Sequence, residues 1–141
     1  MSFIYPKVKK NRDGTFGPTN NGYFYQSVYY HQKNARKNSN KTRWILNLNA
    51  EYYVFRIAME TGWLCHQNLA LFSIINEGEE LLGENDERIG YFKQPINSSD
   101  PWHGFPVKTY DFAPSSSVLD LWEASGVIPY HMKIKIEKRK I

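Results

Sequence analysis

The pattern of hydrophobic and polar positions predicts strands in two parts of the first third of the chain. Residues 23–30, YFYQSVYY, are rich in the aromatic and β-branched side chains that favour strands. In residues 44–49, Trp44, Leu46 and Leu48 alternate with their neighbours at the period of two that is typical of a strand. We therefore predict a strand in each segment, separated by an exposed basic loop or the frayed end of a helix.

Residues 50–61 fit two periods at once. Some of their apolar side chains alternate, whereas others recur at the three- and four-residue spacing of a helix. The segment holds few residues that break helices, and Gly62 stands where a glycine commonly ends one. These features favour a helix over 50–61.

The next apolar segments are short. Residues 69–75, LALFSII, are typical of a buried strand or a short helix, and residues 88–93, RIGYFK, predict a strand that Pro95 ends. The acidic residues of 77–87 lie between them, and we expect these carboxylates to be solvated.

The C-terminal third begins with a helix signal. Three serines precede residues 118–124, VLDLWEA, and a serine three residues before Asp120 imitates a capping box. Gly126 is placed to end that helix. In residues 132–137 apolar and charged side chains alternate, which favours an amphipathic strand, with a short helix beginning near Pro129 as the alternative.

Together these elements predict an α+β fold with a small, mainly antiparallel sheet and two or three helices. Residues 1–22 are rich in proline, glycine and asparagine, so we predict a partly mobile N-terminal segment. Residues 23–141 are then a single compact domain, because 141 residues are an ordinary length for one domain.

Composition narrows the class of protein. Hydrophobic residues make up 41% and charged residues 23%, which fits a soluble globular chain rather than a disordered one. The first residues lack the apolar region of a signal peptide, and no apolar run reaches the roughly 18 residues of a membrane helix. Cys65 is the only cysteine, which excludes an intramolecular disulfide and a cysteine-based zinc cluster. We expect a cytoplasmic protein with no membrane partner.

Charge is segregated along the chain although the net charge is only +4. Residues 1–43 carry nine Lys or Arg and one acid, residues 44–132 carry four and twelve, and residues 133–141 carry five and one. Basic ends with tyrosines nearby could neutralise phosphates and stack on bases, as nucleic-acid-binding proteins do. Alternatively, the basic ends pair with the acidic middle of the same chain.

The sequence contains none of the common metal or nucleotide motifs. Its four histidines lack the spacings that place two imidazoles on one metal, and the acidic cluster lacks the ligand spacing of a calcium loop. The glycine-rich loops that cradle phosphates and the nucleophile elbow are absent too. We therefore predict neither a metal site nor a cofactor.

The strongest local candidate for a site is the stretch SDPWHGFPV, residues 99–107. Two prolines restrict the residues before them, so the loop is stiff on both sides of Trp102 and His103. A histidine titrates near neutral pH and can act as a general acid or base, with Asp100 as a candidate to orient it. The alternative is a rigid connection whose aromatic side chains fill the core.

Three hypotheses for function follow. The leading one is a binding domain for a phosphate-bearing ligand, RNA or DNA, in which Tyr29 and Tyr30 stack on bases and Trp102 and His103 line the site. The basic side chains expected to contact phosphates are Lys33, Arg36, Lys37, Lys41 and Arg43. The second is a metal-independent, ribonuclease-like enzyme that uses His103. The third is a protein-interaction module that neutralises or scaffolds another protein.

Overall fold

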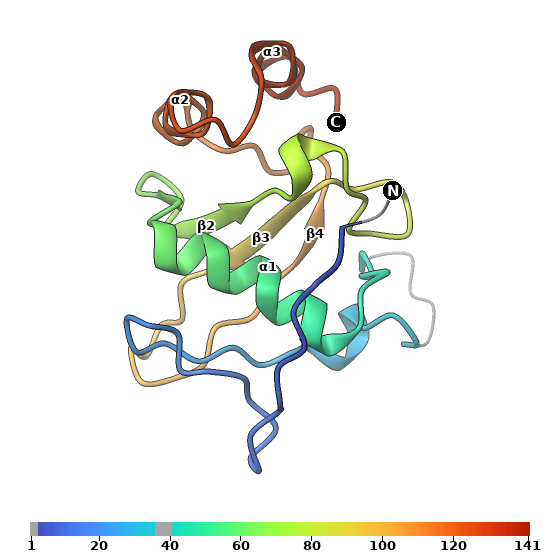
Figure 1. Cartoon of the computed structure of the whole chain (residues 1–141), viewed down its shortest axis with the longest axis vertical. Helices are drawn as coiled ribbons and strands as arrows, with labels where there is room; N and C mark the ends of the chain where they lie inside the picture. Colours follow the sequence, from blue (N-terminus) through green and yellow to red (C-terminus); the bar gives the residue numbers. More distant parts are fainter. Residues whose placement is uncertain (1–2, 36–40) are drawn as a thin grey trace.

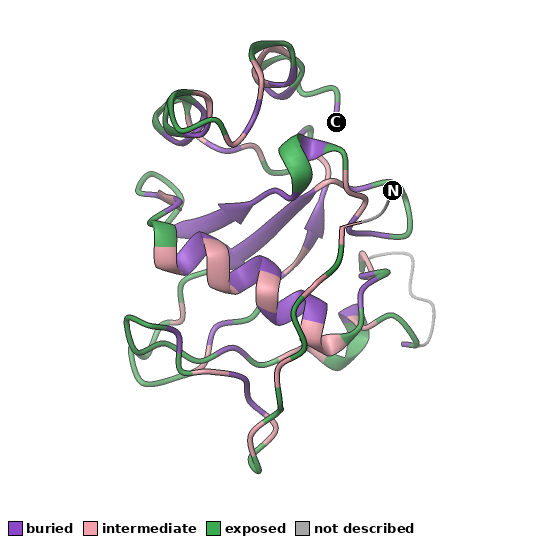
Figure 2. Cartoon of the chain, viewed as in Figure 1, coloured by how far each residue is buried: buried purple, intermediate pink, exposed green. Residues whose placement is uncertain are grey.

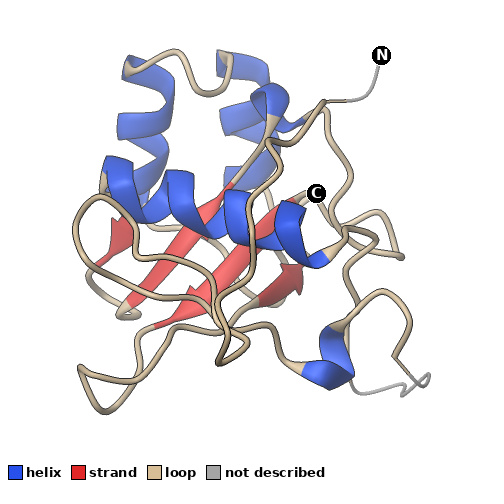
Figure 3. Cartoon of the chain, turned by 60° about the horizontal axis from the view of Figure 1, so that its bottom comes forward, coloured by secondary structure: helices blue, strands red, loops and turns tan. Residues whose placement is uncertain are grey.

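Four short strands pair with one another in the order in which they follow along the chain. A computed structural model describes residues 3–35 and 41–141. Its strands are β1 (Leu64–Cys65), β2 (Ala70–Ser73), β3 (Ile89–Lys93) and β4 (Phe105–Val107), and every neighbouring pair is antiparallel. With three α-helices in the described residues, the fold is the predicted α+β class (Figures 1 and 3). The strand predicted over residues 88–93 is confirmed, and of the two alternatives for residues 69–75 the structure has the strand.

Helix α1 (Leu48–Thr61) confirms the helix predicted over residues 50–61. It begins two residues earlier, because the Asn47 side chain accepts a hydrogen bond from the backbone N–H of Ala50 at 2.9 Å. It ends at Gly62, whose φ of 78° is the left-handed conformation that glycine adopts freely. The strand predicted over residues 44–49 is wrong, since only Trp44 forms a bridge, to Gly83, before the cap begins the helix.

One face of the sheet packs against α1 (Figures 1 and 2). The Ser73 hydroxyl of β2 donates to the backbone oxygen of Val54 at 2.7 Å, and the rings of Phe55 and Phe92 meet edge to face at 5.5 Å. A Cβ at Gly90 would lie 3.0 Å from Val54, so a glycine allows the helix to approach β3 closely. Strands β2 and β3 are buried almost throughout, as Figure 2 shows.

Helices α2 (Ser116–Ala124) and α3 (Tyr130–Glu137) lie together at one end of the sheet (Figure 1). The ammonium group of Lys133 joins them, with Asp120 at 2.9 Å and Glu123 at 3.1 Å. The predicted α2 is confirmed and Gly126 follows its end, but Ser115, at its N-cap, makes no capping side-chain hydrogen bond.

The strand predicted over residues 132–137 is wrong, because this segment is α3. Its alternating pattern hides a helical one: Met132 and Ile136 are four residues apart and both buried, so they share one face of a helix. Pro129 precedes the first turn, where the missing N–H of a proline leaves no unpaired donor.

The strand predicted over residues 23–30 is also wrong. Tyr25 alone forms bridges, one antiparallel to Phe16 and one parallel to Trp102. The backbone then turns into the short 3-10 helix η1 (Tyr29–His31). Of the aromatic side chains that favour a strand here, Tyr25 belongs to the core, since it is fully buried and stacks on Phe55 at 5.2 Å, whereas the other four are exposed.

The described N-terminal residues run across α1 without regular structure (Figure 1). The ring of Phe3 packs against Tyr5 and Tyr53, and the Asn49 amide donates to the backbone oxygen of Pro6 at 2.6 Å. Phe16 is buried. The mobility predicted for residues 1–22, and the boundary at residue 23, stay predictions.

The acidic segment departs from expectation at Glu80, which is half-buried, and more clearly at Glu87. Glu77, Glu79, Glu84 and Asp86 are exposed, as predicted, whereas Glu87 is buried. The Glu87 carboxylate accepts a hydrogen bond from the backbone N–H of Asn85 at 2.9 Å, and its backbone oxygen accepts one from Leu82 at 2.7 Å. This carboxylate therefore folds a turn rather than facing solvent.

Candidate functional site

The stretch from residue 99 to residue 107 is fixed to the N-terminal part of the chain. Trp102 donates its backbone N–H to Phe24 at 2.8 Å, and its backbone oxygen accepts from Gln26 at 2.9 Å. The side chain of Trp102 is buried, with its ring 5.9 Å from that of Phe55. Trp102 therefore belongs to the core, and it lines a different hollow from the one at His103.

His103 is exposed and held in one orientation. Its Nδ1 lies 2.8 Å from the backbone oxygen of Gln26, and because a carbonyl can only accept, Nδ1 carries the hydrogen. The other ring nitrogen, Nε2, is then left to accept or exchange a proton. The group that orients His103 is thus the Gln26 carbonyl, and among the described hydrogen bonds none joins Asp100 to His103.

His103 lines a cavity of about 340 Å³, within the range of roughly 300–1,000 Å³ common for small-molecule sites. Three segments distant in sequence form its walls: residues 28–31, the end of β3 with the residues after it, and the start of β4. The side chains that matter here are Tyr30, His31, Lys93, Ile96, His103 and Phe105. The cavity is therefore largely apolar, with one lysine and two imidazoles at its wall.

His31 forms the wall between this cavity and a second hollow that Lys41 and Phe112 line. Its ring stacks on Phe105 at 4.7 Å with 13° between the planes, and its Nδ1 donates to the backbone oxygen of Thr42 at 2.6 Å. Burial lowers the pKa of His31, so its imidazole is neutral near pH 7. His31 is therefore a fixed, uncharged side chain that separates the two cavities.

The tyrosines expected to stack on a ligand are accessible. Tyr29 is 67% exposed and Tyr30 is 47% exposed. The ammonium group of Lys41 lies 5.0 Å from the centre of the Tyr30 ring, a cation–π contact that places a positive charge beside the aromatic face. Tyr30, Lys41 and His103 therefore occupy one region of the surface.

The remaining predicted basic residues are not equivalent. Lys33 is exposed, whereas the guanidinium of Arg43 pairs with Glu84 and donates to the backbone oxygen of Ala35 at 2.6 Å. Arg43 thus neutralises an acid of the chain's own middle segment. Arg36 and Lys37 lie outside the described residues.

Two of the residues that form the His103 cavity escaped sequence reasoning. His31 directly follows Tyr30, which was a candidate itself, so its position in the sequence was a signal that could have identified it. Lys93 ends β3, and only the antiparallel pairing of β3 with β4 brings it near His103. No signal in the sequence alone marks Lys93.

Within residues 3–35 and 41–141, no three histidine, cysteine or carboxylate side chains gather closely enough to hold a metal ion. None of the helices described is long and apolar enough to cross a membrane. Comparison with known proteins gives no further guidance: the sequence matches no protein-family model, and no curated protein or solved structure is significantly similar to it.

Proposed function

We propose that the protein binds a phosphate-bearing ligand, and that this ligand is single-stranded RNA or DNA. The observation that carries the proposal is one cavity lined by the exposed His103, the half-exposed Tyr30 and the exposed Lys93. Bases of a single strand stack on such aromatic faces, whereas the bases of a duplex are already stacked.

Charge around the cavity supports the same ligand class. Lys41 lies against Tyr30, and Lys33 is exposed close by in sequence. Among the described ion pairs none involves Lys33, Lys41 or Lys93, so their charges remain free to meet phosphates. Arg43 is the exception, because its partner Glu84 already balances its charge.

The test is fluorescence anisotropy with labelled single-stranded RNA, single-stranded DNA and a duplex of the same sequence, each across a salt series. We expect the single strands to bind and their affinity to fall steeply as salt rises, because phosphate contacts release counterions. Affinity that is absent, or that does not change with salt, would contradict the proposal.

Two substitutions locate the binding site. Tyr30→Ala should weaken single-strand binding by roughly tenfold, since one base stacked on an aromatic ring contributes about 1–3 kcal/mol. Tyr110→Ala removes a tyrosine that is also exposed but lines none of the cavities described, so it should leave affinity unchanged. Lys93→Met should reduce the salt slope by about 0.7, whereas Lys10→Met should not.

The ribonuclease hypothesis has one observation in its favour: His103, whose Nδ1 donates to the Gln26 carbonyl, lines the same cavity as Lys93. A histidine placed in this way can accept a proton while a nearby ammonium group stabilises phosphate charge. Incubating the wild-type protein with the RNA of the binding assay tests it. Cleavage that His103→Ala abolishes without unfolding the protein would support an enzyme, and intact RNA would exclude one.

A further inference from the structure

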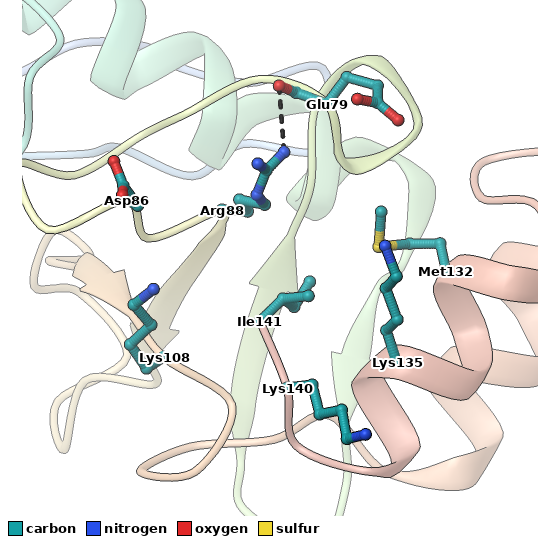
Figure 4. A pocket seen from close by; sticks show the side chains of 8 residues that line it. All are labelled: Glu79, Asp86, Arg88, Lys108, Met132, Lys135, Lys140 and Ile141. Carbon is teal, nitrogen blue, oxygen red and sulfur yellow. Dashed lines mark hydrogen bonds between the residues drawn. The ribbon is translucent and has the colours of Figure 1, made fainter.

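A larger cavity, of about 500 Å³, lies where the C-terminal tail meets the loop before β3 (Figure 4). Its walls come from the loop before β3, the residue after β4, helix α3 and the tail beyond that helix. Figure 4 shows Arg88 and Lys108 on one side, Met132 and Lys135 on the other, and Ile141 between them. None of these residues lines the His103 cavity.

Positive charge dominates this cavity. Four of its lining residues are basic and two are acidic; the basic ones are Arg88, Lys108, Lys135 and Lys140, and the acidic ones are Glu79 and Asp86. Among the described ion pairs none involves any of the six. In Figure 4 the Glu79 carboxylate is turned away from Arg88, which bonds the backbone oxygen of Glu79 instead. Within residues 3–35 and 41–141, these four cations therefore form no ion pair with a side chain of the protein.

The neighbouring lysine of α3 shows the contrast. Lys133 lies between Asp120 and Glu123, and hydrogen bonds to these two carboxylates raise its pKa. Lys135, two residues further along the helix, points into the cavity rim and has no such carboxylate. The chain thus satisfies one lysine of α3 internally and presents another to the cavity.

The cations are attached to fixed parts of the fold. The Arg88 guanidinium donates to the backbone oxygen of Gly78 at 2.8 Å, which sets its position. Thr109, next to Lys108, is fully buried and joins the tail: its N–H and its hydroxyl both donate to the backbone oxygen of Ile141, at 2.7 and 2.6 Å. This clamp fixes the backbone beside Lys108 and Lys140 at the same cavity, so binding has to order their side chains but not the two chain segments.

From this arrangement we infer a second, separate anion site, which binds the phosphate chain of a small molecule carrying at least two phosphate groups. Cations supplied from three segments around one cavity match several negative charges better than a single carboxylate, and the cavity has the volume of a small-molecule site. The apolar part of the wall, Met132 and Ile141, leaves room for the rest of the molecule.

The experiment is a titration of the full chain with inorganic pyrophosphate, followed by calorimetry and by amide chemical shifts. We expect saturable binding and shifts at residues 86–88, 108–109 and 135–141. Lys108→Met and Lys135→Met should each weaken binding by about tenfold or more, because each removes a charge-assisted hydrogen bond. Lys138→Met is the matched control: it removes the same charge from an exposed lysine that does not line the cavity, and affinity should persist.

Absence of saturable binding, or an equal loss in Lys138→Met, would overturn the inference. A competition experiment identifies the kind of molecule that carries the phosphates. A nucleoside triphosphate that displaces pyrophosphate supports a small-molecule site, whereas shifts at these residues with a single-stranded oligonucleotide but not with pyrophosphate would overturn it. The Tyr30→Ala variant should bind pyrophosphate normally, so failure at one site is distinguishable from failure at the other.

Discussion

Gly104 and Phe92 approach each other so closely that a side chain at residue 104 has no room. A Cβ on Gly104 would lie 2.1 Å from Cδ1 of Phe92 and 2.6 Å from the backbone oxygen of Tyr91. Phe92 is itself fully buried, between the rings of Phe55, Tyr25 and Trp44. The glycine of the SDPWHGFPV stretch is therefore required by packing against β3.

Gly104→Ala should lower the free energy of unfolding by about 1–3 kcal/mol or more, because neither the Phe92 ring nor the strand backbone can move aside without disturbing the core. Urea denaturation followed by tryptophan fluorescence measures the change. Ser99→Ala, in the exposed part of the same loop, is the control and should shift stability by less than about 0.5 kcal/mol. Equal stabilities for the two variants would contradict this packing.

Trp102 and Tyr29 should respond to truncation in opposite ways. Trp102→Ala empties a buried volume beside Phe55 and should cost about 3–5 kcal/mol of stability. Tyr29→Ala removes an exposed ring and should cost little, and it is expected to weaken only the binding of a single strand. The midpoint of thermal unfolding and the affinity for a single strand, measured for both variants, distinguish a core residue from a residue of the binding surface. A stable Trp102→Ala protein with lost binding would place Trp102 at the site after all.

Glu51 makes stability depend on pH. Its side chain is fully buried in the first turn of α1 and accepts hydrogen bonds from Tyr25 at 2.9 Å and Ser27 at 2.8 Å. Burial raises the pKa of Glu51 from 4.5 to about 7, although the two hydrogen bonds oppose the shift. Because the folded pKa is the higher one, the unfolded chain loses its proton first. The free energy of unfolding should therefore fall as pH rises from about 4.5 to 7, by up to about 3 kcal/mol.

Glu51→Gln keeps an oxygen that accepts both hydrogen bonds and removes the proton equilibrium. The difference in unfolding free energy between wild type and variant, measured by denaturant titration from pH 4 to 8, should change across that window and be constant outside it. His31 contributes a pH dependence of opposite sign, because its lowered pKa makes the free energy of unfolding rise with pH. This contribution is the same in both proteins, so it cancels in the difference. A difference that stays constant throughout would mean that Glu51 titrates normally.

The clamp between Thr109 and Ile141 should hold the basic tail in place. Thr109→Val retains the shape of the side chain but loses the hydroxyl that donates to and accepts from Ile141. The loss should cost about 1–3 kcal/mol and should speed hydrogen exchange at the amide of Ile141. Thr61→Val, at the exposed end of α1, is the matched control. Unchanged exchange at Ile141 would show that the tail is held by other contacts.

The predictable parts of the fold were those where local signals agree. Helix α1 has apolar residues at helical spacing and ends at Gly62, and the apolar run at 70–73 and the segment before Pro95 are strands of one antiparallel sheet. The strand prediction for the tail was wrong because Met132, Ile134 and Ile136 fit a period of two. Three apolar positions are too few to distinguish that period from the helical one, in which Met132 and Ile136 are buried on one face.

The candidate sites were less predictable, because tertiary structure assembles them. Tyr30 and His103, both candidates from the sequence, line one cavity, but Lys93 reaches them only through strand pairing. The pairing of Ile89 with Val107 brings Arg88 close to Lys108, and Lys135 joins them only because the tail forms α3 at this end of the sheet. The sequence shows which residues are charged, but the tertiary structure decides which charged side chains become neighbours.

The cavity at His103 lies between the N-terminal segment and the sheet, two parts of the chain that are far apart in sequence. The strands of the sheet pair with sequential neighbours, whereas Gln26 and His103 are joined across 77 positions. A contact of such separation closes a long loop, which costs conformational entropy. A ligand seated between Tyr30 and Lys93 would therefore fasten the N-terminal segment to the sheet. Bound ligand should therefore slow the cleavage of residues 3–35 by a protease, whereas the rate of cleavage within the sheet should not change.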